Sequence, residues 1–302
     1  MPTARSAHKA TLGLLLTAGG AFLFASKGLF AKALYRQGVD FQTLTVLRAL
    51  IALPLFSLLA VNRGLRLHRL PGRAIAYAVL AGVLCYAVGA LIDFHALELI
   101  DLSIERARLF RYPALVVLYT AVSRRRLPAP AVLLAVFMTY AGILLVVGAF
   151  DASAWQRNWA GSLMVLFCGT TTATYFLLGE RCIPELGSMG FTIIAMISAT
   201  VFVVLYYLFS HRLAAVLEIS PQGWALLLAL AVLCMFLPTL MQAEGIRRIG
   251  AVRGSLVSTV GPPAALFLGM AMLGERPTLW QLAGTALIII GVFIISRQDA
   301  SP

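Results

Sequence analysis

Apolar runs of about 20 residues recur along almost the whole of this 302-residue chain. Because an α-helix rises about 1.5 Å per residue, a run of this length crosses the ~30 Å hydrocarbon core of a membrane. Hydrophobic residues make up 61% of the chain and charged residues only 12%. Charged residues and helix breakers divide the runs into ten predicted spans, at 11–34, 41–61, 73–97, 101–121, 128–149, 159–180, 188–209, 221–243, 250–272 and 279–296. We therefore expect an all-α integral membrane protein of ten transmembrane helices.

Basic residues are distributed unevenly between the two sides of this arrangement. With a cytoplasmic N-terminus, most of the 24 lysines and arginines fall in cytoplasmic segments, whereas the external loops hold only Arg36, Arg157, Arg212 and Arg276. This positive-inside bias accounts for the net charge of +12 without a nucleic-acid partner. The first run is too long for the apolar core of a signal peptide. We expect a multi-pass protein of the bacterial inner membrane, monomer or homodimer, with both termini in the cytoplasm.

The two halves of the chain match at an offset of 149 residues. The pairs that coincide without a gap are Pro113 with Pro262, Pro128 with Pro277, Leu133 with Leu282, and Gly142 with Gly291. Each half holds five predicted spans, and because five is odd, the second half is inverted in the membrane. Inverted repeats are common in transporters, which bind their substrate near the midplane where the repeats meet.

The second half carries Pro262, the segment Leu273–Pro277 with Glu275 inside it, Gly284 and Gly291. This pattern resembles the signature of helices nine and ten in the EamA branch of the drug/metabolite transporter superfamily. The first half resembles it more loosely through Ser103, Pro113, the segment Arg126–Pro128 and Gly142, and it has Arg126 where the second half has Glu275. The resemblance implies a ten-helix secondary transporter, often an exporter of amino acids or other small metabolites. It also implies two EamA-like repeats, residues 1–150 and 151–302.

Charged residues inside the predicted spans fall into one layer. Counted from the external ends of their spans, these are Lys27, Arg48, Asp93, Glu105 and Arg108, all about four to seven residues deep. At about 1.5 Å per residue, they lie roughly 6–11 Å below the external surface of the hydrocarbon core. A charge inside a bilayer costs about 2.5–3.5 kcal/mol even on lenient scales, so such residues usually mark function. Arg111 lies deeper, and Glu105, Arg108 and Tyr112 follow the spacing of one helix face.

The second half offers hydroxyl and amide side chains inside its spans but no charge near mid-span. We therefore predict a cavity with one charged and one neutral wall. Its cations Lys27, Arg48, Arg108 and Arg111 outnumber Asp93 and Glu105, giving a net charge of +2 that favours a carboxylate-bearing substrate held by arginine. We also place Tyr86, Tyr112 and Tyr175 in the substrate site. Asp93 and Glu105 either orient the cations or carry a coupling proton, and a purely structural ion network that locks the helices stays open as an alternative.

Signatures of other function classes are missing from the sequence. The four cysteines form no Cys-x-x-Cys pair, so neither a metal nor a disulfide framework is indicated. The zinc-protease, serine-hydrolase and phosphate-loop motifs are also missing, and we expect no cofactor and no enzymatic activity. The sequence predicts a secondary transporter that exports a small carboxylate-bearing solute, such as an amino acid or organic acid. The alternative is a polytopic membrane enzyme or lipid-processing protein that acts on an anionic head group.

Overall fold

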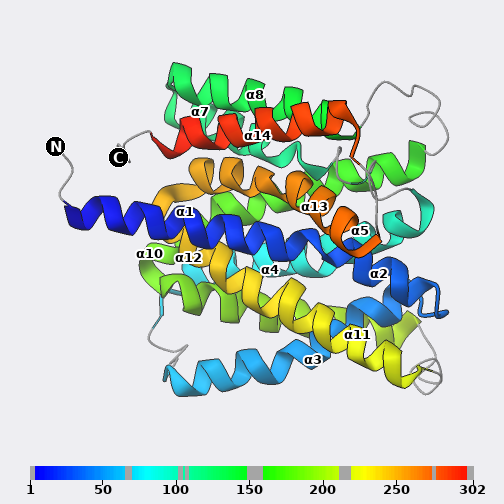
Figure 1. The fold of residues 1–302 in the computed structure, drawn as a ribbon. Coiled ribbons are helices and arrows are strands. Elements are labelled where there is room, and N and C mark those ends of the chain that lie inside the picture. The colour runs from blue at the N-terminus through cyan, green and yellow to red at the C-terminus, as the bar shows by residue number, and fades with distance from the viewer. Residues whose placement is uncertain are drawn as a thin grey trace.

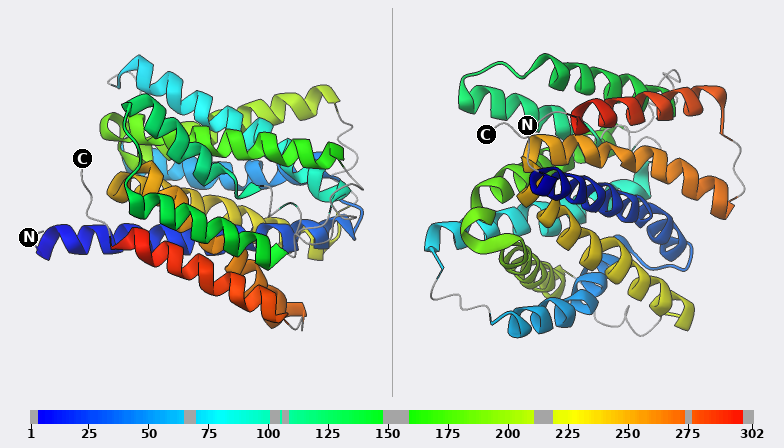
Figure 2. Two further views of the ribbon diagram at one scale, coloured as in Figure 1. Left: turned by 90° about the horizontal axis from the view of Figure 1, so that it is seen from above. Right: turned by 60° about the vertical axis from the view of Figure 1, so that its left-hand side comes forward.

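The computed structural model describes residues 4–64, 70–100, 105, 109–147, 159–210, 219–273 and 277–297, and every regular element in these ranges is helical. Figure 1 shows one bundle in which α1 begins and α14 ends on the same side, as the views of Figure 2 also show. The α-helices are α1 (Ala4–Ala25), α2 (Lys27–Tyr35), α3 (Phe41–Asn62), α4 (Gly72–Gly82), α5 (Gly89–Leu99), α7 (Tyr112–Arg124), α8 (Pro130–Val147), α10 (Trp159–Ser210), α11 (Pro221–Ala231), α12 (Leu237–Val257), α13 (Gly261–Leu273) and α14 (Leu279–Ser296).

Length and apolar composition make these helices suited to a membrane. Six helical stretches of the described chain are long and apolar enough to cross one, namely Ala10–Tyr35, Phe41–Asn62, Gly72–Leu99, Trp159–Phe209, Pro221–Leu268 and Leu279–Ser296, and Pro130–Val146 is a shorter apolar helix. The outer surface carries large apolar side chains, and Leu58, Phe137 and Phe293 are more than half exposed. Such a surface is unfavourable in water and favourable against lipid. The protein is a multi-pass helical membrane protein.

Glycines interrupt helices α10 and α12. Gly187 inside α10 has φ 70° and ψ 159°, and Gly250 inside α12 has φ 78° and ψ 169°. Residues with a Cβ rarely adopt this region of backbone space, so glycine allows the chain to break here. At Gly187, α10 doubles back on itself, as Figures 1 and 2 show. The rings of Tyr175 and Phe191, one on each arm, have centroids 5.1 Å apart.

Two helical stretches contain a π-helical turn. The turn η2 (Val83–Val88) joins α4 to α5, and η4 (Val232–Phe236) joins α11 to α12. A third irregular turn, the 3-10 turn η5 (Ser258–Val260), separates α12 from α13. Turns of this kind change the direction of side chains within a helix and are frequent at functional sites. Both η2 and η5 contribute side chains to the cavity described below.

Helices α8 and α14 approach each other closely enough for their backbones to touch. A Cβ atom built on Gly142 would lie 2.5 Å from the carbonyl oxygen of Gly284, and one built on Gly284 would lie 2.5 Å from the carbonyl oxygen of Gly142. Gly291, two turns further along α14, packs in the same way against Ala135 and Thr139 of α8. Small residues at such contacts give membrane helices their packing energy, because lipid provides no hydrophobic drive between helices.

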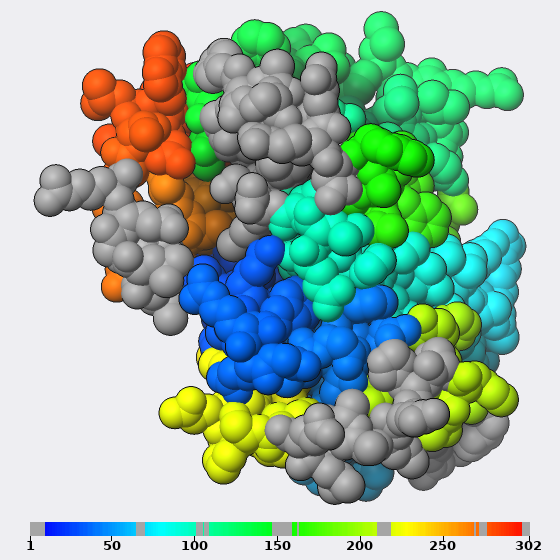
Figure 3. Space-filling model, turned by 90° about the vertical axis from the view of Figure 1, so that its right-hand side faces the viewer, coloured from blue at the N-terminus to red at the C-terminus, as the bar shows by residue number. Residues whose placement is uncertain are grey.

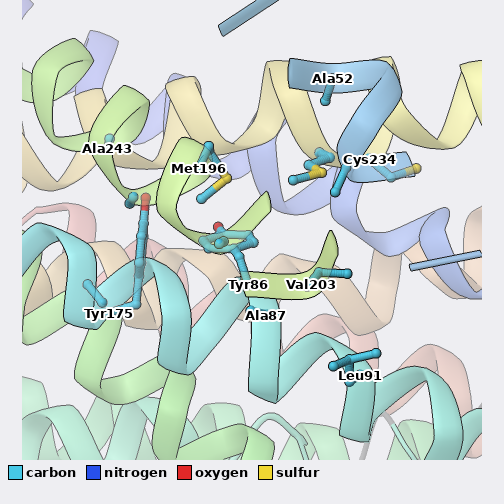
Figure 4. Packing of buried hydrophobic residues seen from close by; sticks show 14 of the residues in the cluster. Ala52, Tyr86, Ala87, Leu91, Tyr175, Met196, Val203, Cys234 and Ala243 are labelled. Carbon is cyan, nitrogen blue, oxygen red and sulfur yellow. The ribbon is translucent and has the colours of Figure 1, made fainter. Parts of the chain in front are cut away.

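Buried apolar side chains pack between the helices of the bundle. Figure 4 shows part of this core, with Tyr86, Tyr175, Met196 and Cys234 packed between the helices. Figure 3 looks at the end of the bundle where α2 and the start of α3, in blue, lie together.

The start of α7 differs from the predicted span at 101–121. Residues 101–104 and 106–108 lie outside the described residues, and α7 begins only at Tyr112. Pro113 therefore stands in the first turn of α7, where its missing N–H has no helical partner to lose. Pro113 thus begins a helix here and does not kink one.

Candidate functional site

A cavity of about 130 Å³ lies inside the bundle and draws on both halves of the chain. Cavities of similar size in other proteins hold a benzene ring, so a small metabolite fits. The side chains that line it from the first half are Ala21, Phe24, Ala25, Lys27, Arg48, Cys85, Tyr86, Gly89, Ala90, Asp93, Phe94, Leu109, Phe110 and Tyr112. Those from the second half are Cys168, Thr171, Thr172, Tyr175, Phe176, Gln242 and Ser258.

Lys27 stands at a break between two helices. α1 ends at Ala25, and α2 begins at Lys27 after Ser26, whose hydroxyl donates to the carbonyl of Leu23. This break occurs inside a predicted span. Ser26 keeps helical backbone angles, φ −77° and ψ −14°, so the interruption is a single irregular turn within one apolar helical stretch.

Lys27 forms an ion cluster with two carboxylates. Its ammonium lies 2.5 Å from Oδ2 of Asp93 on α5 and 3.5 Å from Oε1 of Glu105. The side chains of Lys27, Asp93 and Glu105 are 15%, 7% and 0% exposed. One ammonium therefore contacts two carboxylates.

Arg48 on α3 adds a second buried cation to the cavity wall. Its guanidinium carbon lies 4.7 Å from the centroid of the Phe94 ring, within cation–π range. The Arg48 Nε atom is buried without a hydrogen-bond partner, and so is Oδ1 of Asp93. Among the described residues, no carboxylate oxygen lies within 4.0 Å of the Arg48 guanidinium. The cavity wall thus contains a positively charged donor, Nε of Arg48, and a negatively charged acceptor, Oδ1 of Asp93. These two atoms are not paired with each other.

Aromatic rings cover the sides of the cavity. The rings of Tyr86 and Tyr175 meet edge to face, with centroids 5.1 Å apart and an interplanar angle of 82°, and Figure 4 shows both. Tyr112 stacks on Phe176 at 5.5 Å and 24°. Such surfaces suit the apolar body of a bound solute.

The wall contributed by α12 and η5 is polar but uncharged. The side-chain amide of Gln242 donates to Oγ of Ser258 over 3.1 Å, and both residues are buried. Thr171 and Thr172 on α10 also face the cavity. The structure therefore contains the predicted pair of one charged and one neutral wall.

Six of the nine residues predicted for the site line the cavity, and these are Lys27, Arg48, Tyr86, Asp93, Tyr112 and Tyr175. Glu105 contacts Lys27. Arg108 lies outside the described residues. Arg111 is exposed and is not among the lining residues, although its carbonyl accepts a hydrogen bond from the Tyr140 hydroxyl. The described members of the set that lie at the cavity or beside it are therefore two cations and two carboxylates, and the expected net charge of +2 stays a prediction because its count includes Arg108.

Several lining residues were not predicted for the site. Phe110 and Phe176 are apolar, and apolar residues in a membrane span carry no energetic signal in the sequence, whereas Gln242 is one of the polar side chains on which the predicted neutral wall rests. One signal existed for Ser258, which precedes the Pro262-Pro263 pair and lies in the turn η5 that breaks the helix. A break of this kind next to a hydroxyl indicates a backbone region open to a ligand.

The sequence matches the model of the EamA-like transporter family twice, over residues 11–148 and 159–297. The chain belongs to the EamA-like transporter family. The predicted family is therefore confirmed, and this is a membrane transporter.

Relatives of this EamA-like protein are named as transporters. It is 30% identical to the uncharacterized transporter YcbK of Bacillus subtilis (strain 168), with 96% of this chain and 92% of YcbK covered. It is 25% identical to the uncharacterized transporter YyaM of the same organism over 54% of each chain. A solved crystal structure of another protein superposes with a TM-score of 0.76 over 93% of this chain and 95% of that chain. At 18% sequence identity, that likeness concerns the fold alone.

Proposed function

We propose that the protein is a secondary transporter that moves a small carboxylate-bearing solute across the bacterial plasma membrane by alternating access. The observation that carries the proposal is the cavity wall in which buried Arg48 has no carboxylate beside it among the described residues. Burying an unneutralised guanidinium is costly, and a solute carboxylate offsets that cost with a charge-assisted, bidentate contact. We propose export as the direction, as the family resemblance implies.

The same proposal includes ten spans in two inverted five-helix repeats, residues 1–150 and 151–302. The double match of the family model supports it. Equivalent positions 149 residues apart also share unusual backbone features. Gly38 and Gly187 both have a positive φ, 81° and 70°. The π-helical turns η2 and η4 begin at Val83 and Val232, again 149 residues apart.

Packing between α8 and α14 supports the repeat independently. Gly142 contacts Gly284, which is equivalent to Ala135, and Gly291, which is equivalent to Gly142, contacts Ala135. Two repeats related by a two-fold axis make reciprocal contacts of this kind. The return of α14 to the side on which α1 begins agrees with an even number of spans (Figure 1).

Labelling from outside the cell tests this topology. Gln37 and Glu185 are exposed side chains beside Gly38 and Gly187. In a cysteine-free background, we expect a membrane-impermeant maleimide to label Gln37→Cys in intact cells and Glu185→Cys only after lysis. Labelling of both positions from the same side would contradict the inverted repeat and the cytoplasmic placement of the termini.

Transport by purified protein tests the function. Proteoliposomes are loaded with a mixture of amino acids and organic acids, and mass spectrometry follows each compound inside and outside. We expect at least one carboxylate-bearing compound to cross with its mass unchanged, and Arg48→Gln to abolish this flux. The matched control is Arg36→Gln, because Arg36 is exposed at the end of α2. Flux that persists in Arg48→Gln would reject the site, and a change of mass would indicate an enzyme.

A further inference from the structure

The Lys27 ammonium occupies a position suited to an ammonium group of a bound solute. It lies within 3.5 Å of a carboxylate oxygen of both Asp93 and Glu105. It reaches them from the cavity wall, and Asp93 lines the same cavity. The two carboxylates therefore form a cation subsite that the protein fills with its own side chain.

A second observation is that two polar atoms of the cavity-lining residues are buried without a hydrogen-bond partner. Oδ1 of Asp93 is buried without a hydrogen-bond partner, in a residue that is only 5% exposed. Nε of Arg48, in a residue that is 4% exposed, is also buried without one. Each such atom is costly until a ligand supplies its partner. A ligand that satisfies both atoms has to offer a hydrogen-bond donor to Asp93 and an acceptor to Arg48. Both residues line the same cavity.

We propose that Lys27 is a built-in competitor for the ammonium group of a zwitterionic solute. On binding, the solute ammonium replaces Lys27 at Asp93, the solute carboxylate pairs with Arg48, and Lys27 stays paired with Glu105. This inference rests on the proposed function and specifies its substrate class. Each of the four residues Lys27, Arg48, Asp93 and Glu105 then has a partner of opposite charge in the bound state.

Partner exchange has a consequence for selectivity. An amine without a carboxylate has to displace Lys27 from Asp93 and gains no contact at Arg48 in return. An acid without an amine binds Arg48 and leaves the Lys27–Asp93 pair in place. Only the zwitterion makes both contacts, so Lys27 excludes simple organic cations from a cavity whose wall contains the carboxylate of Asp93.

Binding to matched probes tests the proposal. One probe set is leucine, 4-methylpentanoate and 3-methylbutylamine, and the other is phenylalanine, 3-phenylpropanoate and 2-phenylethylamine. Within each set the amino acid is compared with its acid and its amine, using dissociation constants for purified protein in detergent. For wild type we expect the order amino acid, then acid, with the amine weakest. In Lys27→Gln, we expect the amine to bind at least tenfold more tightly than to wild type.

Lys32 provides a control on the same helix. Its ammonium donates to the carbonyls of Leu97 and Ile100. Lys32→Gln removes the same charge from α2 while leaving Lys27 at its carboxylates, so its binding constants should match those of wild type. Equal amine affinity in Lys27→Gln and wild type would overturn the proposal.

Glu105→Gln keeps the test decisive if Lys27→Gln does not fold. This variant retains the Lys27–Asp93 pair but removes the second partner to which Lys27 withdraws. We expect the affinity for the amino acid to fall at least tenfold, with the affinity for the acid unchanged. If the affinity for the amino acid is unchanged, the partner exchange of Lys27 is refuted but the proposed function is not. Failure of every carboxylate-bearing probe to bind wild type would refute the proposed function as well.

Discussion

The ammonium of Lys27 lies 2.5 Å from Oδ2 of Asp93, across 66 residues of sequence. The contact joins the start of α2, immediately after the break at Ser26, to the middle of α5. Glu105 lies 3.5 Å from the same ammonium. A buried ion pair is weak evidence for stability in itself, because desolvation offsets the attraction, but loss of one partner leaves an uncompensated charge. The position of Lys27 between two carboxylates makes its removal the more damaging change.

The first prediction compares the two partners in thermal unfolding. Lys27→Met removes the cation that contacts both buried carboxylates, which is expected to cost about 3–5 kcal/mol. Asp93→Asn costs less, because Lys27 retains Glu105. Melting of purified protein in detergent without added solute checks the order. A lower melting temperature for Asp93→Asn than for Lys27→Met would contradict the assignment of Lys27 as a shared cation.

The second prediction concerns the α8–α14 contact. Gly142→Ala places a methyl group 2.5 Å from the carbonyl oxygen of Gly284, so the helices have to separate. Overpacking of this kind costs about 1–3 kcal/mol. Gly72→Ala is the matched control, since nothing lies within 4 Å of a Cβ atom at Gly72. Melting temperature and the fraction of monodisperse protein provide the measurement, and equal behaviour of the two variants would exclude close backbone packing.

The third prediction concerns Gly187, where a substitution tests backbone strain without steric crowding. A Cβ atom there meets nothing within 4 Å, but the backbone has φ 70° and ψ 159°. We expect Gly187→Ala to destabilise the protein by about 1–3 kcal/mol through strain alone. The measurement is again the melting temperature, relative to Gly72→Ala. If both alanine variants melt together, the reversal of α10 does not depend on glycine.

Helix boundaries were predictable where the chain carries a cap or a breaker. The span predicted at 41–61 corresponds to α3, because the Asp40 carboxylate accepts hydrogen bonds from the backbone N–H groups of Gln42 and Thr43. The span at 279–296 has the bounds of α14, which begins with a capping box at Thr278 and Gln281. The beginning of α7 at Tyr112 was not predicted, although Pro113 in its first turn is a helix-start signal.

The charged part of the cavity could be predicted because charge in a hydrocarbon layer has a high cost. Depth along the helix was enough to bring Lys27, Arg48 and Asp93 to one layer. Depth does not determine the direction in which a side chain points, and this is why Arg111 was expected in a cavity that it does not line. The neutral pair of Gln242 and Ser258 gave no comparable signal, since its position depends on how α12 and η5 pack against the first half.

Ligand-induced stabilisation of wild type and Arg48→Gln tests the central claim most directly. Purified protein of each kind is melted in the presence of single amino acids, carboxylic acids, amines and nucleosides, with Arg36→Gln as the control. We predict that carboxylate-bearing compounds, amino acids foremost, raise the melting temperature of wild type and Arg36→Gln and have no effect on Arg48→Gln. Stabilisation of wild type mainly by organic cations, or by the same acids in Arg48→Gln, would contradict a solute site at Arg48.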